Sequence, residues 1–362
     1  MSEQKALVIS SSSSPYTVVS KPIPVPGPNE VLIKLQGAGL NPAEWKLTLY
    51  TEVLDLIGFP VYTGTDGAGV VETVGSGVTD LKKGDRVLFQ GWFTADHTTF
   101  QQYAISPKGL VTKLPEAISI LEAASLPMAV TTAAFGFGLP NSPVPSGTEV
   151  AGDSVKLPLF TAGRSGAGLK PFWEDGAKGS KSGQPLVVLG GSSSVGQLVI
   201  QVAFHYGFSP IITTSSAKHA DFLKSLGATH VLDRDTSIEK FKDILQGKPV
   251  EYIYDAVNAI SQAFVDLVAP GGTFIIVSPA PAEIAFNDGR KCIFANGFSH
   301  IYKEYAYGLA GALGGLLESG VIKPNRVEKV PGGLAGILDG LARLQENKVS
   351  GVKLVVDPSE TP

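Results

Sequence analysis

The stretch that most constrains the fold is Val187–Gln201, which reads VVLGGSSSVGQLVIQ. An apolar run comes first, then a turn of glycines and serines, and then a segment in which apolar residues recur with the period of a helix. A strand, turn and helix of this kind can hold a dinucleotide pyrophosphate, because backbone N–H groups at the helix N-terminus face the phosphates. The sequence therefore predicts a dinucleotide site with contacts from Gly191, Ser192, Ser193, Ser194 and Val195.

This turn departs from the usual G-x-G-x-x-G fingerprint, because Ser193 stands where the middle glycine is expected. Gly190 and Gly191 still permit a sharp turn off the strand, and Gly196 lets the helix lie close to the sheet. A serine is small, and its hydroxyl is able to donate to a phosphate oxygen. We therefore keep the prediction of coenzyme binding; the alternative is a tight strand-to-helix turn in an α/β domain without a coenzyme.

The end of the next predicted strand indicates which coenzyme is bound. NAD sites usually carry an Asp or Glu about 20 residues after the fingerprint, but Thr213–His219, TTSSAKH, contains no acid. Ser215, Ser216 and Lys218 instead offer hydroxyls and a positive charge to a 2′-phosphate. We predict NADPH as the coenzyme. Alternatively, Lys218 is an ordinary solvated lysine in the first turn of a helix.

The 362 residues exceed what one hydrophobic core usually serves, so two domains are expected. The first third is β-rich, with short apolar-alternating runs at Glu30–Gly39, Ala68–Gly75 and Lys82–Gln90. From Pro185 onward strands alternate with helices, which predicts an α/β domain with a doubly wound parallel sheet. After Ala295 the pattern is helical, up to a last strand that we expect to pack on the N-terminal domain.

The predicted domain bounds follow from these changes in pattern. They are 1–137 completed by 320–362 for the β-rich domain, and 185–319 for the coenzyme domain. Between them, 138–184 is rich in Gly, Ser and Pro without a helical period, and it reads as an insertion. We interpret the insertion as a surface excursion. A lid is the alternative, which Phe160, Phe172 and Trp173 keep open because large apolar side chains tend to be buried.

Composition narrows the choice of partners and location. The net charge is −4 without a basic block, which argues against a nucleic-acid partner. We expect no membrane-spanning segment and no secretion signal, because no uncharged apolar run is long enough and the N-terminus lacks a basic and an apolar region. The single cysteine, Cys292, fits a reducing compartment, so we predict a cytoplasmic protein. The five histidines show no metal-binding spacing, and no metal site is predicted.

The order of motifs along nearly the whole chain, apart from the insertion, resembles the medium-chain dehydrogenase/reductase superfamily. The matching segments are Gly37–Leu47, Gly64–Leu88, Glu122–Ala133, Gly190–Gly196 and Leu226–Asp233. The resemblance implies a GroES-like β-rich catalytic domain and a Rossmann coenzyme domain. Zinc-dependent members hold the metal with a cysteine and a histidine where this chain has Asn41 and Thr65, so it looks like a zinc-independent branch.

Within that branch the sequence motifs are most similar to those of the stand-alone enoyl reductases that serve fungal polyketide synthases in trans. They are also similar to those of quinone oxidoreductases. The resemblance implies catalytic or positioning roles for Lys46 and Thr132. Alternatively, Lys46 is a surface lysine that covers Trp45, and Thr132 bonds its own helix. Tyr62 is a further candidate acid, or else a core tyrosine. Arg234 stands where those reductases commonly have a tyrosine; it either supplements Lys218 at the 2′-phosphate or is a surface residue.

Further contacts complete the predicted site. The strand end at Val277 and Ser278 should lie near the nicotinamide, since ligands bind at the carboxyl ends of such strands. Coenzyme contacts are also assigned to Ala43, Glu44, Trp45, Lys46, Arg234, Val352 and Lys353. The resemblance places Ala133, Phe135 and Phe137 in an apolar substrate pocket.

The chemistry follows from the missing metal. Without zinc to stabilise an alkoxide, oxidising a simple alcohol is difficult, whereas an electron-poor C=C bond accepts a hydride more readily. We predict an NADPH-dependent reductase of enoyl thioesters or α,β-unsaturated carbonyl compounds, with a polyketide synthase in trans as one partner that the resemblance implies. An NADPH quinone oxidoreductase and a non-catalytic NADPH-binding protein remain the alternatives, and a monomer and a homodimer are both open.

Overall fold

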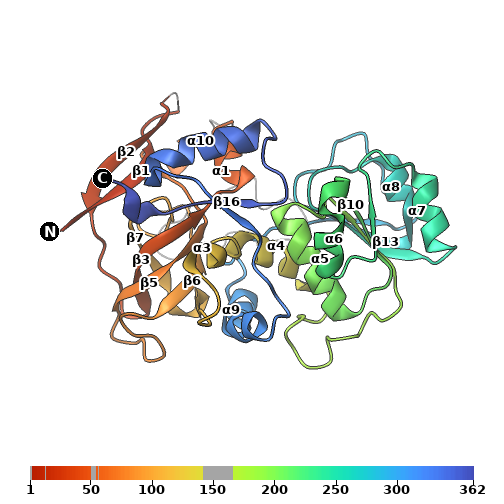
Figure 1. Cartoon of the computed structure of the whole chain (residues 1–362), viewed down its shortest axis with the longest axis horizontal. Helices are drawn as coiled ribbons and strands as arrows, with labels where there is room; N and C mark the ends of the chain where they lie inside the picture. Colours follow the sequence, from red (N-terminus) through yellow and green to blue (C-terminus); the bar gives the residue numbers. More distant parts are fainter. Residues whose placement is uncertain (1, 13, 50–53, 56, 142–165) are drawn as a thin grey trace.

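The computed structural model describes residues 2–12, 14–49, 54–55, 57–141 and 166–362. Two lobes lie side by side along the longest axis of the molecule (Figure 1). The β-rich lobe carries both ends of the chain, and the α/β lobe, residues 186–294, carries a parallel sheet. Phe160 and the rest of 142–165 lie outside the described residues.

The β-rich lobe contains two sheets. The smaller sheet has the order β2-β1-β4, with β1 at Glu3–Ile9, β2 at Tyr16–Pro22 and β4 at Val61–Tyr62. The larger sheet has the order β15-β16-β3-β5-β6-β8, and β7 pairs with β3 outside that path. Its strands are β15 (Val327–Lys329), β16 (Lys353–Val356), β3 (Glu30–Gly39), β5 (Asp66–Val74), β6 (Arg86–Gln90), β7 (Tyr103–Pro107) and β8 (Val111–Lys113).

Strand β3 shows why this sheet forms. Val31, Ile33 and Leu35 alternate along it and are fully buried, while Lys34 between them points to solvent. The C-terminal strand β16 runs antiparallel to β3, with Val355 opposite Gly39. The last residues of the chain therefore lie beside the segment that leads into the predicted nicotinamide region.

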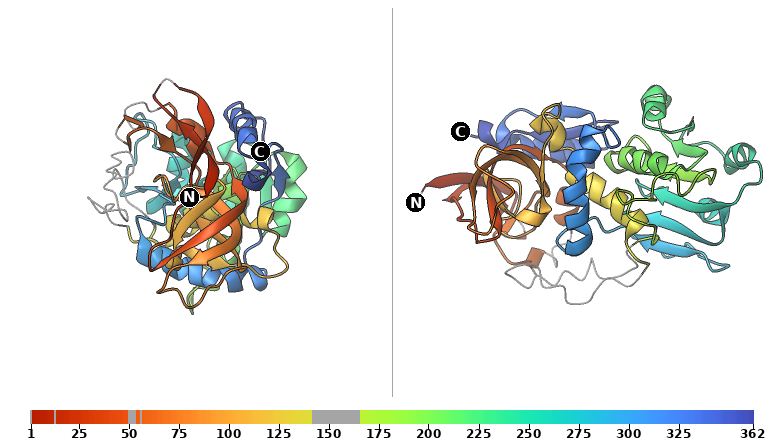
Figure 2. Two further views of the ribbon diagram at one scale, coloured as in Figure 1. Left: turned by 90° about the vertical axis from the view of Figure 1, so that its left-hand side faces the viewer. Right: turned by 90° about the horizontal axis from the view of Figure 1, so that it is seen from below.

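Helices connect and cover the two lobes. Figure 2 shows α4 (Pro127–Gly138) and α9 (Lys303–Glu318) between the barrel-like sheets and the parallel sheet. The amphipathic α10 (Gly333–Gln345) packs its buried Leu334, Ile337 and Leu341 on the β-rich lobe. The shorter elements are α1 (Pro42–Leu47), α3 (Ile120–Ala123), η1 (Lys108–Leu110) and η4 (Pro358–Glu360).

The α/β lobe has a parallel six-stranded sheet in the order β11-β10-β9-β12-β13-β14. This doubly wound order confirms the predicted fold class. Its strands are β9 (Leu186–Leu189), β10 (Ile211–Thr214), β11 (His230–Leu232), β12 (Val250–Asp255), β13 (Val268–Ile276) and β14 (Lys291–Phe294). Its helices are α5 (Ser194–Tyr206), η3 (Ala217–His219), α6 (Ala220–Ser225), α7 (Ile238–Leu245) and α8 (Gln262–Leu267). The order of strands switches at β9, whose carboxyl end carries the glycine turn.

Within the predicted insertion, 166–184 runs over the surface but is anchored in the core at Phe172 and Ala177. Its backbone bonds the end of α4, with Ala167 N donating to Gly136 O and Leu169 N donating to Phe137 O, both at 2.9 Å. Phe172 is 1% exposed and its ring lies 6.1 Å from that of His205 on α5. The large apolar side chain of Phe172 therefore completes the existing core, which a wholly detached surface excursion would not do.

One other expectation needs correction. The region after Ala295 is not uniformly helical, because β15 lies between α9 and α10. Among the described residues, Ile120–Gly138 is long and apolar enough to cross a membrane by length and composition alone. Most of this stretch is buried inside the fold, as is usual for core helices such as α3 and α4.

Candidate active site

The turn after β9 forms a cradle that only glycine fits. Gly190 has a φ of 79°, and a Cβ on it would lie 2.3 Å from the side chain of Val257. A Cβ on Gly191 would lie 2.1 Å from Thr213 Oγ1, and one on Gly196 would lie 2.3 Å from the Gly190 carbonyl oxygen. The helix therefore approaches the strand more closely than any larger residue permits, which is the geometry that a pyrophosphate site needs.

Ser193 has a structural role in this cradle. It is the N-cap of α5, and its Oγ accepts a hydrogen bond from Gly196 N at 3.0 Å. Its hydroxyl proton remains able to point at a phosphate oxygen. Ser192, Ser194 and Val195 are half-buried around the same helix N-terminus. The turn thus fits a pyrophosphate although the middle glycine is replaced.

The predicted 2′-phosphate residues come from the ends of two adjacent strands. Ser215 follows β10 and is buried, Ser216 is half-buried, and Lys218 on η3 is exposed. Arg234 follows β11 and reaches Ser216 Oγ at 3.4 Å. The Thr214 hydroxyl accepts from Gly190 N at 2.9 Å, which ties this strand end to the glycine turn. The structure therefore brings the two predicted phosphate sites to one edge of the sheet.

A buried polar centre lies in the β-rich lobe at the start of α1. Its members are Asn41, Glu44, Thr65, Asp66 and Lys353. The helix starts here because Asn41 is its N-cap, Pro42 occupies its first turn and the Glu44 carboxylate accepts from Asn41 N at 2.6 Å. Asn41 Nδ2 donates to Asp66 at 2.9 Å, and the Thr65 hydroxyl donates to Glu44 at 2.9 Å. These bonds hold α1 against β5.

The charges in this centre are unequal. Lys353 Nζ lies 2.7 Å from the Asp66 carboxylate, with side-chain exposures of 3% and 0%. Burial, together with the nearby Asp66 carboxylate, raises the pKa of Glu44 from 4.5 to about 7. Two carboxyl groups therefore share the Lys353 ammonium group, and Glu44 gains or loses its proton near neutral pH.

This donor set does not suit zinc. Zinc prefers thiolate and imidazole ligands, whereas the two positions in question carry an amide and a hydroxyl. A protonated amine already lies beside the Asp66 carboxylate, where a metal ion would be repelled. Within the described ranges, no group of three or more His, Cys, Asp or Glu residues is arranged to hold a metal ion.

Lys46 lies on α1, one turn beyond the polar centre. It is half-buried, as are Ala43 and Trp45, and its Nζ lies 5.8 Å from the centroid of the Trp45 ring. This contact agrees with the alternative interpretation, in which the aliphatic part of Lys46 covers Trp45. The ammonium group nevertheless belongs to the last turn of α1. Trp45 Nε1 is buried without a hydrogen-bond partner in the described part of the chain.

Thr132 lies within α4 and is 5% exposed. Its hydroxyl donates to Met128 O at 2.7 Å, one turn earlier in the same helix. Gly297, in the segment after β14, packs so closely that a Cβ on it would lie 2.2 Å from Thr132 Oγ1. The proton of this hydroxyl is therefore already used, and its lone pairs are the part left for a ligand.

The three predicted substrate residues on α4 are fully buried. Phe135 packs edge-on against Tyr302 and Tyr305, and Phe137 packs against Tyr206 and Tyr254. Ala133 is likewise 0% exposed. This placement favours packing over direct contact with a substrate, so a pocket formed by these residues stays a prediction.

The other predicted residues are more dispersed. Val277 and Ser278 are half-buried just beyond the carboxyl end of β13, and Val352 is half-buried just before β16. Lys353 faces Asp66 and Asn41, so its predicted contact with a coenzyme stays a prediction. Tyr62 lies on β4 with Lys21 Nζ 4.7 Å from its ring centroid, and burial raises its pKa.

Sequence reasoning missed two buried residues that shape the site. Gln90 donates to Gly297 O at 2.8 Å and accepts from Ser299 N at 2.7 Å, which fixes the connection between the lobes. Asp255, at the carboxyl end of β12, accepts from Val257 N at 3.0 Å and so holds the loop that covers Gly190. Their type and position alone gave no signal, because the partners are distant in sequence or are backbone atoms.

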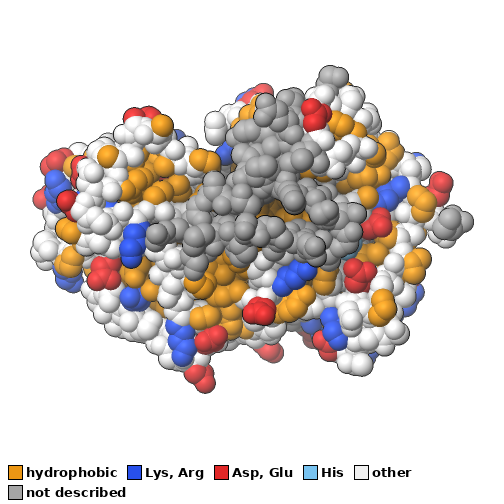
Figure 3. All heavy atoms as spheres, turned by 180° about the vertical axis from the view of Figure 1, so that it is seen from behind, with side chains coloured by type: hydrophobic (Ala, Val, Ile, Leu, Met, Phe, Trp, Pro, Cys, Tyr) orange, Lys and Arg blue, Asp and Glu red, His pale blue; other side chains and the backbone are white. Residues whose placement is uncertain are grey.

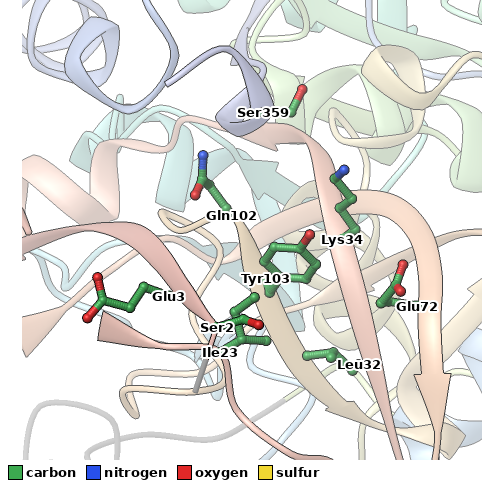
Figure 4. Close-up of a pocket in the computed structure, with 9 residues that line it drawn as sticks. All are labelled: Ser2, Glu3, Ile23, Leu32, Lys34, Glu72, Gln102, Tyr103 and Ser359. Carbon is green, nitrogen blue, oxygen red and sulfur yellow. The ribbon is translucent and has the colours of Figure 1, made fainter. Parts of the chain in front are cut away.

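The surface adds two observations. A hollow of about 540 Å³ lies on the β-rich lobe, where Tyr103 and Lys34 project between the strands (Figure 4), and it shares no lining residue with the predicted site. On the face shown in Figure 3, acidic and basic side chains are interspersed, which is not the single basic patch that nucleic-acid binding favours.

Both lobes match known protein families. Residues 27–116 match the alcohol dehydrogenase GroES-like domain, and residues 194–299 match the zinc-binding dehydrogenase family. The chain is 31% identical to 2-methylene-furan-3-one reductase of Solanum lycopersicum, over 91% of this chain and 72% of that protein. It is 30% identical to the trans-enoyl reductase himH of Aspergillus japonicus, over 92% of this chain and 90% of that protein. The solved CurK enoyl reductase has the same fold, with a TM-score of 0.72 at 19% identity over 98% of this chain and 99% of that one.

Proposed function

The chain belongs to the medium-chain dehydrogenase/reductase superfamily and is an oxidoreductase of that type; on that premise we propose that it is an NADPH-dependent, zinc-independent reductase of activated C=C bonds. The observation that carries the proposal is the combination of two sites. The glycine cradle after β9 fits a pyrophosphate, and the polar centre under α1 holds the Lys353 ammonium group among donors that zinc does not prefer.

Coenzyme choice rests on the ends of β10 and β11. Ser215, Ser216, Lys218 and Arg234 together offer hydroxyls and positive charge to a 2′-phosphate. An arginine beside a serine suits a phosphate group, because guanidinium donors bind its oxygens in pairs.

We propose that the coenzyme domain comprises 185–319 and that 1–137 with 320–362 form the catalytic domain.

The chemistry needs a hydride donor and stabilisation of a developing enolate. When bound, NADPH supplies a hydride from nicotinamide C4 to the β-carbon of an activated alkene. Lys46 is the basic residue in the last turn of α1. Its ammonium group would donate a hydrogen bond to the enolate oxygen. A proton then reaches the α-carbon from Lys46 or from water.

Thr132 has a different role in this proposal. Because its proton is engaged by Met128 O, the hydroxyl accepts rather than donates. A suitable donor is the carboxamide N–H of the nicotinamide, which would fix the rotation of the ring. Thr132 is therefore proposed as a positioning residue and Lys46 as the donor.

The substrate class follows from the absence of a Lewis acid in this proposal. A hydride adds readily to a C=C bond that is conjugated to a carbonyl or a thioester, since the carbonyl group accepts the developing charge. The two relatives named above are, by their names, reductases of an enoyl compound and of a methylene conjugated to a ketone, which supports this class. A polyketide synthase acting in trans is proposed as a partner, and a cytoplasmic location as the setting.

Steady-state assays with one coenzyme and three acceptors test the proposal. We expect NADPH oxidation with a 2-enoyl thioester or a small enone, and loss of that activity in Lys46→Ala. Thr132→Val should lower the rate while Thr132→Ser retains most of it. Turnover of quinones alone would indicate a quinone oxidoreductase, and tight NADPH binding without turnover would indicate a non-catalytic protein; either result contradicts the proposal.

A further inference from the structure

A histidine links the predicted 2′-phosphate turn to the β-rich lobe. His219 is the last residue of η3, directly after Lys218, and it is 5% exposed. Its Nε2 lies 2.9 Å from Ser350 Oγ, and its Nδ1 lies 3.0 Å from a terminal nitrogen of Arg326. Ser350 precedes β16 and Arg326 precedes β15, so both partners come from the segments that lead into the C-terminal strands of the other lobe. Figure 1 shows the connection between α10 and β16 reaching toward the α/β lobe.

These contacts fix the protonation state of the imidazole. Arginine carries donors and no acceptor, so Nδ1 must accept and therefore carries no proton. Nε2 then carries the proton and donates to Ser350 Oγ. His219 is thus neutral when the link is made, and an imidazolium ion would present a donor to a donor at Arg326.

The link is closely fitted on both sides. Arg326 Nε donates to Gly351 O at 3.2 Å, and the arginine lies 3.9 Å from the centroid of the Phe222 ring on α6. Gly351 has a φ of 70°, and a Cβ on it would lie 2.4 Å from His219 Cε1. The close approach and the left-handed backbone both require glycine here.

A continuous path of contacts follows from this fit. Lys353 N donates to Arg326 O at 2.7 Å, and the Lys353 ammonium group bonds Asp66 and Asn41 in the polar centre. Asn41 caps α1, which carries Lys46. The turn that carries Lys218 is therefore joined through His219, the 350–353 loop and Lys353 to the helix that carries the proposed donor.

We propose that His219 is a positioning residue that couples the coenzyme's 2′-phosphate site to the catalytic lobe through the 350–353 loop. The inference rests on the proposed coenzyme site. A 2′-phosphate that orders the Ser215–Lys218 turn also orders His219, and His219 holds the loop that carries Val352 and Lys353. NADPH should therefore rigidify the loop, and a coenzyme without the 2′-phosphate should do so less.

Acid should weaken the link. The charges that act on the imidazole are Arg326, from the segment before β15, and Lys218, from its own turn; with burial as the largest cause, they lower the pKa of His219 below 6.5. The neutral imidazole and the link persist at pH 7, and both are lost as the pH falls through that lowered pKa.

Hydrogen exchange at the 350–353 amides tests the proposal without any substrate. The full chain is compared with and without NADPH or NADH, in wild type, His219→Ala and His219→Gln, with His230→Ala as a control at an exposed histidine of the same lobe. Glutamine is neutral and offers one donor and one acceptor, so it should preserve the link at every pH. We expect faster exchange in His219→Ala, and NADPH dissociation constants raised at least about fivefold in that variant alone. Lowering the pH should reduce the protection of these amides, measured as the exchange rate relative to the intrinsic rate at the same pH, in wild type but not in His219→Gln.

Several outcomes decide the matter. Unchanged exchange in coenzyme-free His219→Ala overturns the link, whatever the coenzyme does. A wild-type chain that binds neither coenzyme overturns both the coupling and the proposed function, whereas equal binding of NADPH by wild type and His219→Ala overturns the coupling alone. Should His219→Ala fail to fold, Ser350→Ala removes the other partner, and unchanged exchange in that variant counts against the proposal in the same way.

Discussion

Glu44, Asp66 and Lys353 lie in one buried centre, in which the ammonium group of Lys353 bonds the Asp66 carboxylate. Removing one partner of such a cluster leaves an uncompensated charge, which is costly in a low-dielectric interior. The family resemblance implied that Asn41 and Thr65 stand where zinc-dependent members have metal ligands, but it gave no sign that Lys353, far along the chain, would contact this centre. Such a contact becomes visible only when β16 pairs with β3.

The pH dependence of stability should report on Glu44. Its pKa is raised in the folded chain to about 7, so the folded state holds the proton more tightly than the unfolded state. The contribution of this group to the free energy of unfolding is therefore present at low pH and is lost as the pH rises through about 7. Glu44→Gln removes the titration, and the difference between wild type and variant should change by up to about 3 kcal/mol between pH 4.5 and pH 8. Urea unfolding at several pH values measures it; parallel curves for the two proteins would contradict the assignment.

Lys218 allows a test at the other end of the site. If its ammonium group meets a 2′-phosphate, Lys218→Ala should weaken NADPH binding by about 1–3 kcal/mol and leave NADH binding almost untouched. Lys224→Ala, at an exposed lysine of α6, is the matched control and should change neither. Fluorescence titration of the reduced coenzymes gives the dissociation constants. Equal effects on both coenzymes would mean that Lys218 does not recognise the phosphate.

At the scale of elements, α5 shows why a serine can replace the fingerprint glycine. The Ser193 side chain caps the helix, so the residue stabilises the element whose N-terminus faces the phosphates. The fingerprint has glycine at this position so that no side chain blocks the ligand. The Ser193 side chain is small and its Oγ accepts from Gly196 N, so the serine caps the helix while its hydroxyl proton can still reach a phosphate oxygen.

Two substitutions separate these roles. Ser193→Ala removes the cap and should lower the free energy of unfolding by about 1 kcal/mol. Ser193→Gly should lower the free energy of unfolding by only about 0.3 kcal/mol. Both variants should still bind NADPH, because the backbone donors remain. Thermal and chemical unfolding measure the first effect and coenzyme titration the second; equal stability of the two variants would exclude the capping role.

The segment 166–184 is the element that the sequence described least well. Glycine, serine and proline give it no periodicity, yet Phe172 and Ala177 are buried against the α/β lobe. We expect Phe172→Ala to lower the free energy of unfolding by about 3–5 kcal/mol, as for a buried phenylalanine, and Lys178→Ala, at an exposed residue, to have little effect. Urea unfolding of both variants checks this, and a loss below about 1 kcal/mol for Phe172→Ala would contradict the packing.

Strands and helices with strong patterns were predicted well. Glu30–Gly39 was predicted as a strand with the bounds that β3 has, and the helix after the glycine turn was placed correctly on α5. Strand β14, Lys291–Phe294, was missed because four residues are too few to show a clear strand pattern. The roles of Thr132 and Phe135 depended on packing against residues from distant segments, which a pattern along the chain does not contain.

For the whole molecule, the C-terminal segment joins the two lobes. Strands β15 and β16 belong to the sheet of the β-rich lobe, while Ser350 and Arg326 next to them contact His219 of the α/β lobe. Side-chain contacts of His219 therefore join the α/β lobe to the β-rich lobe, in addition to the helices α4 and α9 that lie between them. The doubly wound parallel sheet could be inferred from the alternation of strands and helices, but this connection could not, because it depends on side chains that meet across the lobes.

The central claim is that this chain holds a phosphorylated nicotinamide coenzyme without the help of zinc. The most direct test is calorimetric titration of protein that has been dialysed against a chelator, with NADPH and NADH in parallel. We expect NADPH to bind at one site per chain and at least about tenfold more tightly than NADH, equivalent to about 1.4 kcal/mol. Equal affinities, a preference for NADH, or binding that returns only when zinc is added would contradict it.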